Sequence, residues 1–262
     1  MMRFGWAVLL AAAPLAAQFD HSAWDRVLKK STNVLGEVDY GALKKDRKDL
    51  DDYVRRLSEM SPDSKKDAFP TREAALAYWL NAYNALVMRA VVDAYPTKSV
   101  RDLGLLYGFF RRKDHTLGGT KISLLALEND IIRPRFNDAR IHFAIVCASI
   151  SCPLLDREAF QPDTVDTHLD RLTRRFLTER RNLLLDPASK TVTVSALFDW
   201  YKKDYGDVRA FLKKYAGEED RRTLGSWGEF RIKHFDYDWS INDPGSRAKA
   251  KSPLERELAG GR

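Results

Sequence analysis

The sequence is poor in cysteine and has no lipid-attachment cysteine after the apolar run near its N-terminus. Only two cysteines occur in 262 residues, which excludes a disulfide-dense scaffold. The N-terminal apolar run is too short for a membrane-spanning helix, which needs about 20 residues. The chain contains no glycine- or proline-rich linker, no internal repeat and no recognisable nucleic-acid-binding motif. We therefore expect one domain and no nucleic-acid partner.

The N-terminus has the pattern of a secretory signal peptide. Arg3 precedes an apolar run over residues 7–15, and the small residues Ala16 and Ala17 stand before Gln18. A positive start, a short apolar core and a small-residue cleavage site are typical of exported proteins. We predict a signal peptide over residues 1–17, a single globular domain over residues 18–262, and a periplasmic or secreted location.

The charge of the chain is moderately positive. The formal net charge is +7, and removal of Arg3 with the leader leaves +6. Because 37 acidic residues are interspersed, most of this charge is expected to solvate the surface, and weak contact with an anionic envelope is the alternative. About 245 residues can bury a core without disulfides, and we expect a monomer.

The hydrophobic pattern predicts an α+β fold. Helical spacing is found over residues 40–60 and 71–95, and the second of these is apolar nearly all round, which indicates a central buried helix. Several helices are expected to pack around it and against a small, mainly antiparallel sheet. The other expected helices cover residues 123–132, 164–179, 196–205 and 208–215, and the strands or hairpins cover 111–122, 141–146, 183–194 and 230–237.

The two cysteines lie five residues apart, directly after the expected strand 141–146. In an exported protein, Cys147 and Cys152 could pair in a disulfide, either structural or redox-active. A loop this short gains little entropic stabilisation from closure. A functional role for the thiols therefore remains an alternative.

The second interpretation makes Cys152 a nucleophile. Pro153 suits the first position of a helix through Phe160, which would place Cys152 at the N-cap and lower its pKa. His142 is the candidate base, and strand alternation puts Cys147 on the opposite face. Glu128 is the candidate orienting residue.

Asn81, Asn84 and Cys147 are candidate substrate-binding residues. Asn81 and Asn84 share a face of the central helix, where they either donate to a developing oxyanion or satisfy loop backbone. His142 could equally be a structural strand histidine. Asp199 and Asp204 are ordinary surface carboxylates unless one orients His142. A zinc site of Glu128, His142, Cys147 and Cys152 is the least favoured alternative, so no metal or cofactor is expected.

The motifs of the chain resemble those of the family known as domain of unknown function 547. The similar stretches cover nearly the whole mature chain and are residues 38–40, 78–86, 96–102, 125–134, 141–154, 198–205 and 237–242. The resemblance brings no established reaction, but members that also carry a glutaredoxin-like domain associate the family with thiol chemistry. A distant papain- or transglutaminase-like fold is conceivable, although those enzymes carry cysteine on the helix before the histidine, and the central helix here has none.

Two functions follow as hypotheses. The first is a thiol-dependent hydrolase or acyl transferase acting on envelope peptides or amides, with Cys152, His142 and Glu128 as catalytic residues. The alternative is a non-catalytic domain with a Cys147–Cys152 disulfide that binds a small molecule or peptide, or a thiol-redox protein.

Overall fold

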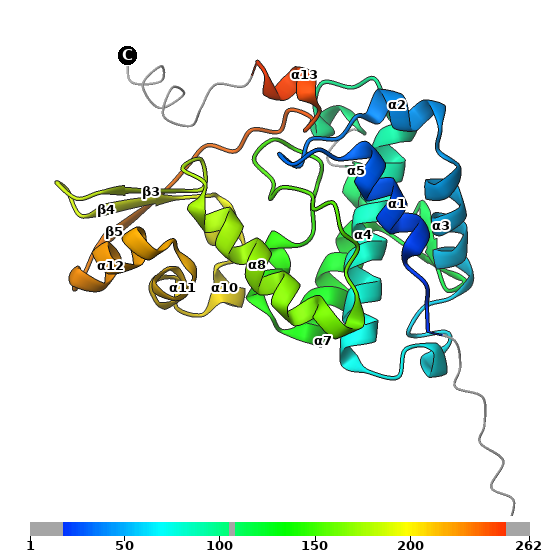
Figure 1. Cartoon of the computed structure of the whole chain (residues 1–262), viewed down its shortest axis with the longest axis horizontal. Helices are drawn as coiled ribbons and strands as arrows, with labels where there is room; N and C mark the ends of the chain where they lie inside the picture. Colours follow the sequence, from blue (N-terminus) through cyan, green and yellow to red (C-terminus); the bar gives the residue numbers. More distant parts are fainter. Residues whose placement is uncertain (1–17, 105–107, 250–262) are drawn as a thin grey trace, which may run out of the picture.

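The protein has an α+β architecture, as the sequence predicts. The structure, a computed structural model, describes residues 18–104 and 108–249, so the predicted signal peptide lies outside the described residues. Figure 1 shows α1 (Ser22–Ser31), α3 (Lys48–Glu59) and α4 (Arg72–Ala94) on one side of the molecule. A small sheet lies on the other side with α10 (Lys202–Tyr205), α11 (Val208–Tyr215) and α12 (Glu218–Ser226). One hydrophobic cluster surrounds α4, and a second lies between the sheet and α11. In the described part, no helix is long and apolar enough to cross a membrane.

The central helix is α4, Arg72–Ala94, which confirms the predicted buried helix. It begins where the Thr71 side chain accepts a hydrogen bond from the amide of Ala74, an N-cap that satisfies one of the free amides of the first turn. It ends before Pro96, which cannot continue the helix. Most of its residues from Ala74 to Val92 are buried, because other elements cover it on several sides.

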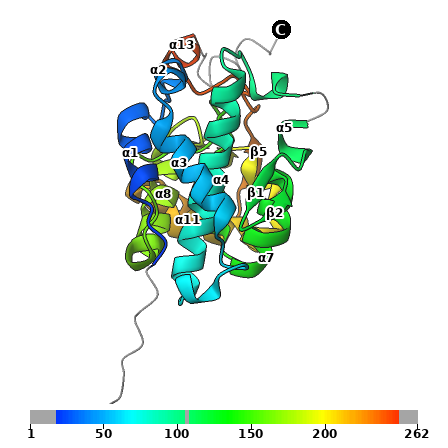
Figure 2. The same cartoon turned by 90° about the vertical axis from the view of Figure 1, so that its right-hand side faces the viewer.

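The N-terminal layer consists of α1, Ser22–Ser31, α2, Tyr40–Lys45, and α3, Lys48–Glu59. The single helix expected over residues 40–60 is therefore wrong. The backbone leaves helical geometry at Asp46, with φ −136° and ψ 78°, and the chain turns before α3 starts. In Figure 2, α3 lies beside α4, with the hairpin of β1, His115–Leu117, and β2, Thr120–Ile122, next to it.

A helical segment after the hairpin carries Glu128. It runs through α6, Leu124–Ala126, the π-helix η4, Leu127–Ile132, and α7, Arg133–Phe136. The predicted helix over residues 123–132 is confirmed and extends further. Its end is set by Asn137, whose φ of 45° is in the left-handed region that closes many helices.

The strand expected over residues 141–146 is not formed. Residues Ala139–Phe143 make a 3-10 helix, η5, started by the Asp138 side chain, which accepts from the amide of Arg140, and an irregular segment follows. Every residue from Ile141 to Val146 is buried. A short apolar run of this kind does not distinguish a strand from another buried conformation. The argument that His142 and Cys147 occupy opposite faces of a strand therefore fails.

The C-terminal half contains α8, Val165–Thr178, followed by a three-stranded sheet in the order β3-β4-β5. The predicted antiparallel hairpin is confirmed as β3, Leu183–Asp186, and β4, Thr191–Val194. The closing strand β5, Arg231–His234, pairs parallel with β4. A helix that was not predicted, α12, Glu218–Ser226, lies between α11 and β5. The short helices are η1 Lys66–Ala68, η2 Val100–Asp102, α5 Gly108–Arg111, η6 Pro162–Thr164, α9 Leu197–Trp200, α10 Lys202–Tyr205, α11 Val208–Tyr215 and α13 Pro244–Arg247.

After β5 the chain returns to the cysteine segment. Ser149 forms an antiparallel bridge with Ile241, and Ser99 forms one with Ser240. The amide of Ile150 donates to the Ser240 carbonyl at 2.9 Å. This return places residues 237–242 against the two cysteines.

Candidate functional site

A cavity of about 230 Å³ lies between α4, η4, η5 and the returning C-terminal segment. Its wall is mainly aromatic and contains three of the residues predicted to be catalytic, His142, Glu128 and Cys152. Trp200, 46% exposed, and Leu125, 41% exposed, connect it to the surface. It is lined by Tyr83, Phe110, Arg111, Leu125, Glu128, His142, Ile145, Cys147, Cys152, Pro153, Leu197, Trp200, Tyr201, Tyr237 and Trp239.

The two cysteines are in contact in the wall of this cavity. Both are free thiols, and their Sγ atoms lie 2.6 Å apart, which is longer than the disulfide bond length of about 2.05 Å. Cys147 is half-buried and Cys152 is buried. The Tyr237 hydroxyl lies 3.3 Å from the Cys147 sulfur, and the Ser149 hydroxyl lies 3.1 Å from it. A thiol pair with polar partners in a cavity wall is suited to covalent chemistry.

Cys152 is the sulfur of the pair that ionises more easily. Burial alone would raise its pKa, but hydrogen bonds from the Cys147 thiol, the Tyr237 hydroxyl and the Cys147 amide lower the pKa to about 7. The amide contact is 2.9 Å from nitrogen to sulfur. Burial and the neighbouring Cys152 sulfur raise the pKa of Cys147. The pair therefore holds one thiolate and one thiol near neutral pH.

The predicted helix from Pro153 through Phe160 is wrong, so the lowered pKa of Cys152 does not come from a helix N-terminus. Residues 153–161 have no helical structure, and the next helical turn is η6. Cys152 instead closes a turn in which its own amide donates to the Ser149 carbonyl at 3.2 Å. Ala148, which precedes that turn, adopts a left-handed φ of 66°.

His142 pairs with Asp204 rather than with Glu128. His142 Nε2 lies 2.7 Å from Asp204 Oδ2, and Arg133 donates two hydrogen bonds to the same carboxylate. The ring of Tyr201 stacks on the imidazole with centroids 3.8 Å apart. Burial lowers the pKa of His142 to about 4, although Asp204 opposes the shift. No hydrogen bond joins His142 to either sulfur among the described residues.

Glu128 lies in the cavity wall and contacts tyrosines. The Tyr83 hydroxyl donates to its Oε2 at 3.3 Å, and the Tyr201 hydroxyl faces the same carboxylate. Burial raises the pKa of Glu128, against the effect of these hydroxyls and of Arg133. Tyr201 therefore separates Glu128 from His142.

Asn81 and Asn84 fix loop backbone, which is one of the two roles that the sequence left open. The Asn84 side chain donates to the Ala144 carbonyl at 2.8 Å and accepts from the Val146 amide at 2.9 Å. Asn81 makes the same two bonds to the backbone of Phe160. Neither side chain lines the cavity. Asn84 thus anchors the segment that leads to Cys147.

The sequence missed the contribution of Tyr237, Trp200 and Trp239. Trp200 and Trp239 stack with centroids 5.6 Å apart, and Tyr237 lies 4.5 Å from Trp239. The available signals were the aromatic residues at 198, 200, 201 and 205, whose spacing is more typical of a buried core, and the aromatic residues after β5. These rings lie beside the cysteines because residues 237–242 return to the cysteine segment. Local sequence patterns do not predict such a tertiary contact.

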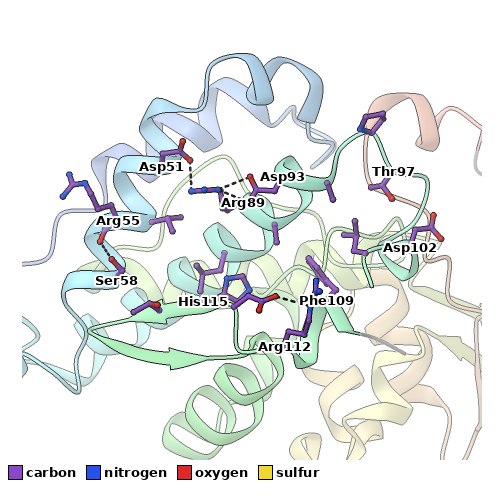
Figure 3. A pocket seen from close by; sticks show the side chains of 18 of the residues that line it. Asp51, Arg55, Ser58, Arg89, Asp93, Thr97, Asp102, Phe109, Arg112 and His115 are labelled. Atoms are coloured by element: carbon purple, nitrogen blue, oxygen red, sulfur yellow. Dashed lines mark hydrogen bonds and ion pairs between the residues drawn. The ribbon is translucent and has the colours of Figure 1, made fainter. Parts of the chain in front are cut away.

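A larger and more open cleft, of about 1150 Å³, lies between α3, α4 and the β1–β2 hairpin (Figure 3). Figure 3 shows Arg89 between Asp51 and Asp93, and both ion pairs are formed. Arg112 pairs with Asp114 in the same cleft. None of the residues predicted to be functional lines it, and these charges neutralise one another. The aromatic cavity is the stronger candidate.

Two further charged features are structural in character. Asp156, Glu158 and His168 have potential ligand atoms within 4.8 Å of one another, but Arg171 donates to both carboxylates. This is the one such cluster found in the described residues, so the candidate zinc set around Cys152 does not converge. The other arginines of α8 and of the turn after it also contact protein partners, namely Arg174 with Lys214, Arg175 with Val34, Arg180 with Asp220, and Arg181 with Glu179.

The fold and site define an α+β protein with a thiol pair in an aromatic cavity. Residues 68–177 match the model of a family described as "Protein of unknown function, DUF547". This segment is somewhat less than half of the chain, and the match agrees with the resemblance that the motifs indicated. The segment contains Glu128, His142 and both cysteines, whereas Asp204 and Tyr237 lie outside it. No curated protein and no solved structure matches the chain.

Proposed function

We propose that the cavity performs thiol–disulfide exchange with Cys147 and Cys152 as the redox pair. The observation that carries the proposal is the contact of the two sulfurs at 2.6 Å in the wall of a cavity that reaches the surface. The lowered pKa of Cys152 supports it, because the thiolate is the species that attacks a disulfide.

The exchange consists of two substitutions at sulfur. The Cys152 thiolate attacks one sulfur of a substrate disulfide, so that a mixed disulfide forms and the other substrate sulfur leaves as a thiolate that takes a proton from water. Cys147 then attacks the Cys152 sulfur and gives its proton to the departing second substrate sulfur. The protein dithiol is oxidised to a disulfide, and the substrate disulfide is reduced to two thiols.

The test is intact mass after incubation with glutathione disulfide. We expect the wild type to lose two hydrogens without dimerising and to regain them in mild reductant. Cys147→Ser should instead accumulate a glutathione adduct on Cys152, and Cys152→Ser should accumulate much less adduct. A pair that never oxidises would reject the proposal. A bond that resists mild reductants would favour the non-catalytic domain with a structural disulfide.

A second candidate is the thiol-dependent hydrolase or acyl transferase. The observation that favours it is the His142–Asp204 pair, because a carboxylate-oriented histidine beside a thiolate is the usual arrangement of a cysteine nucleophile and its base. His142 Nδ1 has no partner and would be the basic atom. In this hypothesis the Cys152 thiol gives its proton to His142 and attacks the carbonyl carbon of an amide in an envelope peptide. The C–N bond breaks, the amine leaves with that proton, and water or an acceptor amine then releases the acyl group from the sulfur.

The two candidates are distinguished by His142→Asn. If His142 activates the thiol, alkylation of Cys152 by iodoacetamide near pH 7 should slow by at least tenfold in the variant. If the pair is redox-active, the alkylation rate should stay within about twofold of wild type, because Tyr237 and the Cys147 amide hold the thiolate.

A further inference from the structure

The cavity contains a buried acceptor that no protein group satisfies. His142 Nδ1 has no hydrogen-bond partner, and the residue is 2% exposed. Because the ionised Asp204 accepts from the other ring nitrogen, the proton of the neutral imidazole lies on Nε2. Nδ1 is therefore a lone-pair acceptor, and a buried acceptor without a donor is costly. Nδ1 has almost no accessible surface, so a ligand in the cavity does not reach it, and the neutral ring contributes to the wall without a positive charge.

Glu128 is a second acceptor in the same wall. Its side chain forms no ion pair with any described residue, and only tyrosine hydroxyls contact its carboxylate. The nearby Arg133 is already bidentate on Asp204. Arg111, the cationic side chain among the described lining residues, is exposed, so water screens its charge. A buried carboxylate with two of its four lone pairs engaged accepts further donors and favours a cation.

His142 does not neutralise Glu128, because its ring is uncharged and Tyr201 lies between the two residues. Tyr201 stacks on the His142 ring and directs its hydroxyl to Glu128. The remaining wall is formed by aromatic rings, among them Tyr83, Tyr237 and Trp200. Aromatic faces attract cations and also pack against methylene groups.

We propose that the cavity binds a primary ammonium group on an alkyl chain, as on a lysine side chain, with the ammonium donating to Glu128 and the chain lying along the aromatic wall. Glu128 is an acceptor with unused lone pairs, which is why a donor cation fits and a quaternary ammonium, which has no N–H, does not. The inference deepens the proposed function by naming the substrate class, a peptide or amine that presents a lysine-like group beside its disulfide.

The experiment is a ligand-observed NMR titration of the full-length mature protein with three probes of similar size. These are n-butylamine, the neutral isostere n-butanol, and tetramethylammonium, which is a cation without a donor. We expect n-butylamine to bind at least tenfold more tightly than either of the other two, as a charge-assisted hydrogen bond predicts. Equal affinity for n-butanol, or for tetramethylammonium, would overturn the proposal.

Variants locate the binding and separate it from the thiol chemistry. Glu128→Gln keeps the shape of the side chain and should weaken n-butylamine binding about tenfold or more, whereas the exposed Glu158→Gln should not change it. An unchanged affinity in Glu128→Gln would also overturn the proposal. The double variant Cys147→Ser, Cys152→Ser should bind n-butylamine as the wild type does. If it does, failure of the disulfide-exchange test would reject the redox function alone. If Glu128→Gln does not fold, the comparison of the three probes on the wild type decides.

Discussion

At the scale of single residues, the acidity of Cys152 depends on donors that are distant in the sequence. The Tyr237 hydroxyl is 90 residues from Cys147 and contributes to the lowered pKa of Cys152. A hydrogen bond to a charged group contributes about 1.5–3 kcal/mol, and about 1.4 kcal/mol corresponds to one pKa unit. The hydroxyl therefore decides whether much of the protein holds the thiolate at pH 7.

Tyr237→Phe removes this donor and keeps the ring. We expect the pKa of Cys152 to rise by about one unit, and the rate of iodoacetamide alkylation at pH 7 to fall about fivefold. The measurement is the pH profile of alkylation, followed by intact mass. A profile that coincides with that of the wild type would show that Tyr237 does not stabilise the thiolate.

Tyr205→Phe is the matched control for that experiment. The Tyr205 hydroxyl is buried without a partner, and removing a buried unsatisfied hydroxyl relieves a penalty of roughly 1 kcal/mol. We expect its free energy of unfolding, from urea denaturation, to equal or exceed that of the wild type, with the alkylation profile unchanged.

Sequence reasoning brought the candidate site residues together but did not identify their partners. Cys147, Cys152, His142 and Glu128 all line one cavity, as chemistry-bearing residue types near one another in the chain suggested. Asp204, which orients His142, was considered only conditionally, because a surface-like carboxylate on an amphipathic segment carries no local sign of its partner. Its role follows from tertiary packing of α10 against η5.

At the scale of elements, α4 and the C-terminal segment hold the cysteine segment from two sides. Asn84 on α4 forms two hydrogen bonds with the backbone just before Cys147. The long, capped helix was predictable from its apolar composition and from Thr71. The irregular conformation of residues 144–152 was not, because buried side-chain amides replace the ladder that a strand would need.

Asn84→Ala should therefore affect both stability and thiol chemistry. Loss of two buried hydrogen bonds is expected to lower the free energy of unfolding by about 2–4 kcal/mol. It should also change the alkylation rate of Cys152 at least threefold, because the Cys147 amide that donates to the sulfur moves. Asn81→Ala removes the same pair of bonds at Phe160 and should cost similar stability with an unchanged alkylation rate. Equal effects of both variants on that rate would contradict the anchoring role.

At the scale of the whole molecule, buried neutral histidines link stability to pH. Burial lowers the pKa of both His21 and His142 to about 4, whereas an unfolded histidine titrates near 6.5. Between pH 4 and pH 6.5, the unfolded state therefore binds more protons than the folded state. The stability that these residues contribute is complete above about pH 6.5 and is lost as the pH falls toward 4.

Urea denaturation at several pH values checks this dependence. Each histidine is expected to contribute a loss of roughly 3 kcal/mol across the window. His21→Gln should remove about 3 kcal/mol of the loss between pH 6.5 and pH 4, whatever its effect at neutral pH. A free energy of unfolding that stays constant over this window would contradict the burial of the neutral forms.

The return of residues 237–242 to the cysteine segment also sets an order of events during biosynthesis. The ribosome releases Cys147 and Cys152 well before it releases Tyr237, which is 90 residues later. Until residues 237–242 pack against the cysteine segment, the two thiols lack the Tyr237 donor and the backbone hydrogen bonds made by Ser240 and Asn242. A chain stalled or cleaved before Tyr237 would carry an incomplete wall and an unshielded thiol pair, so the site is completed only after residues 237–242 have been synthesised.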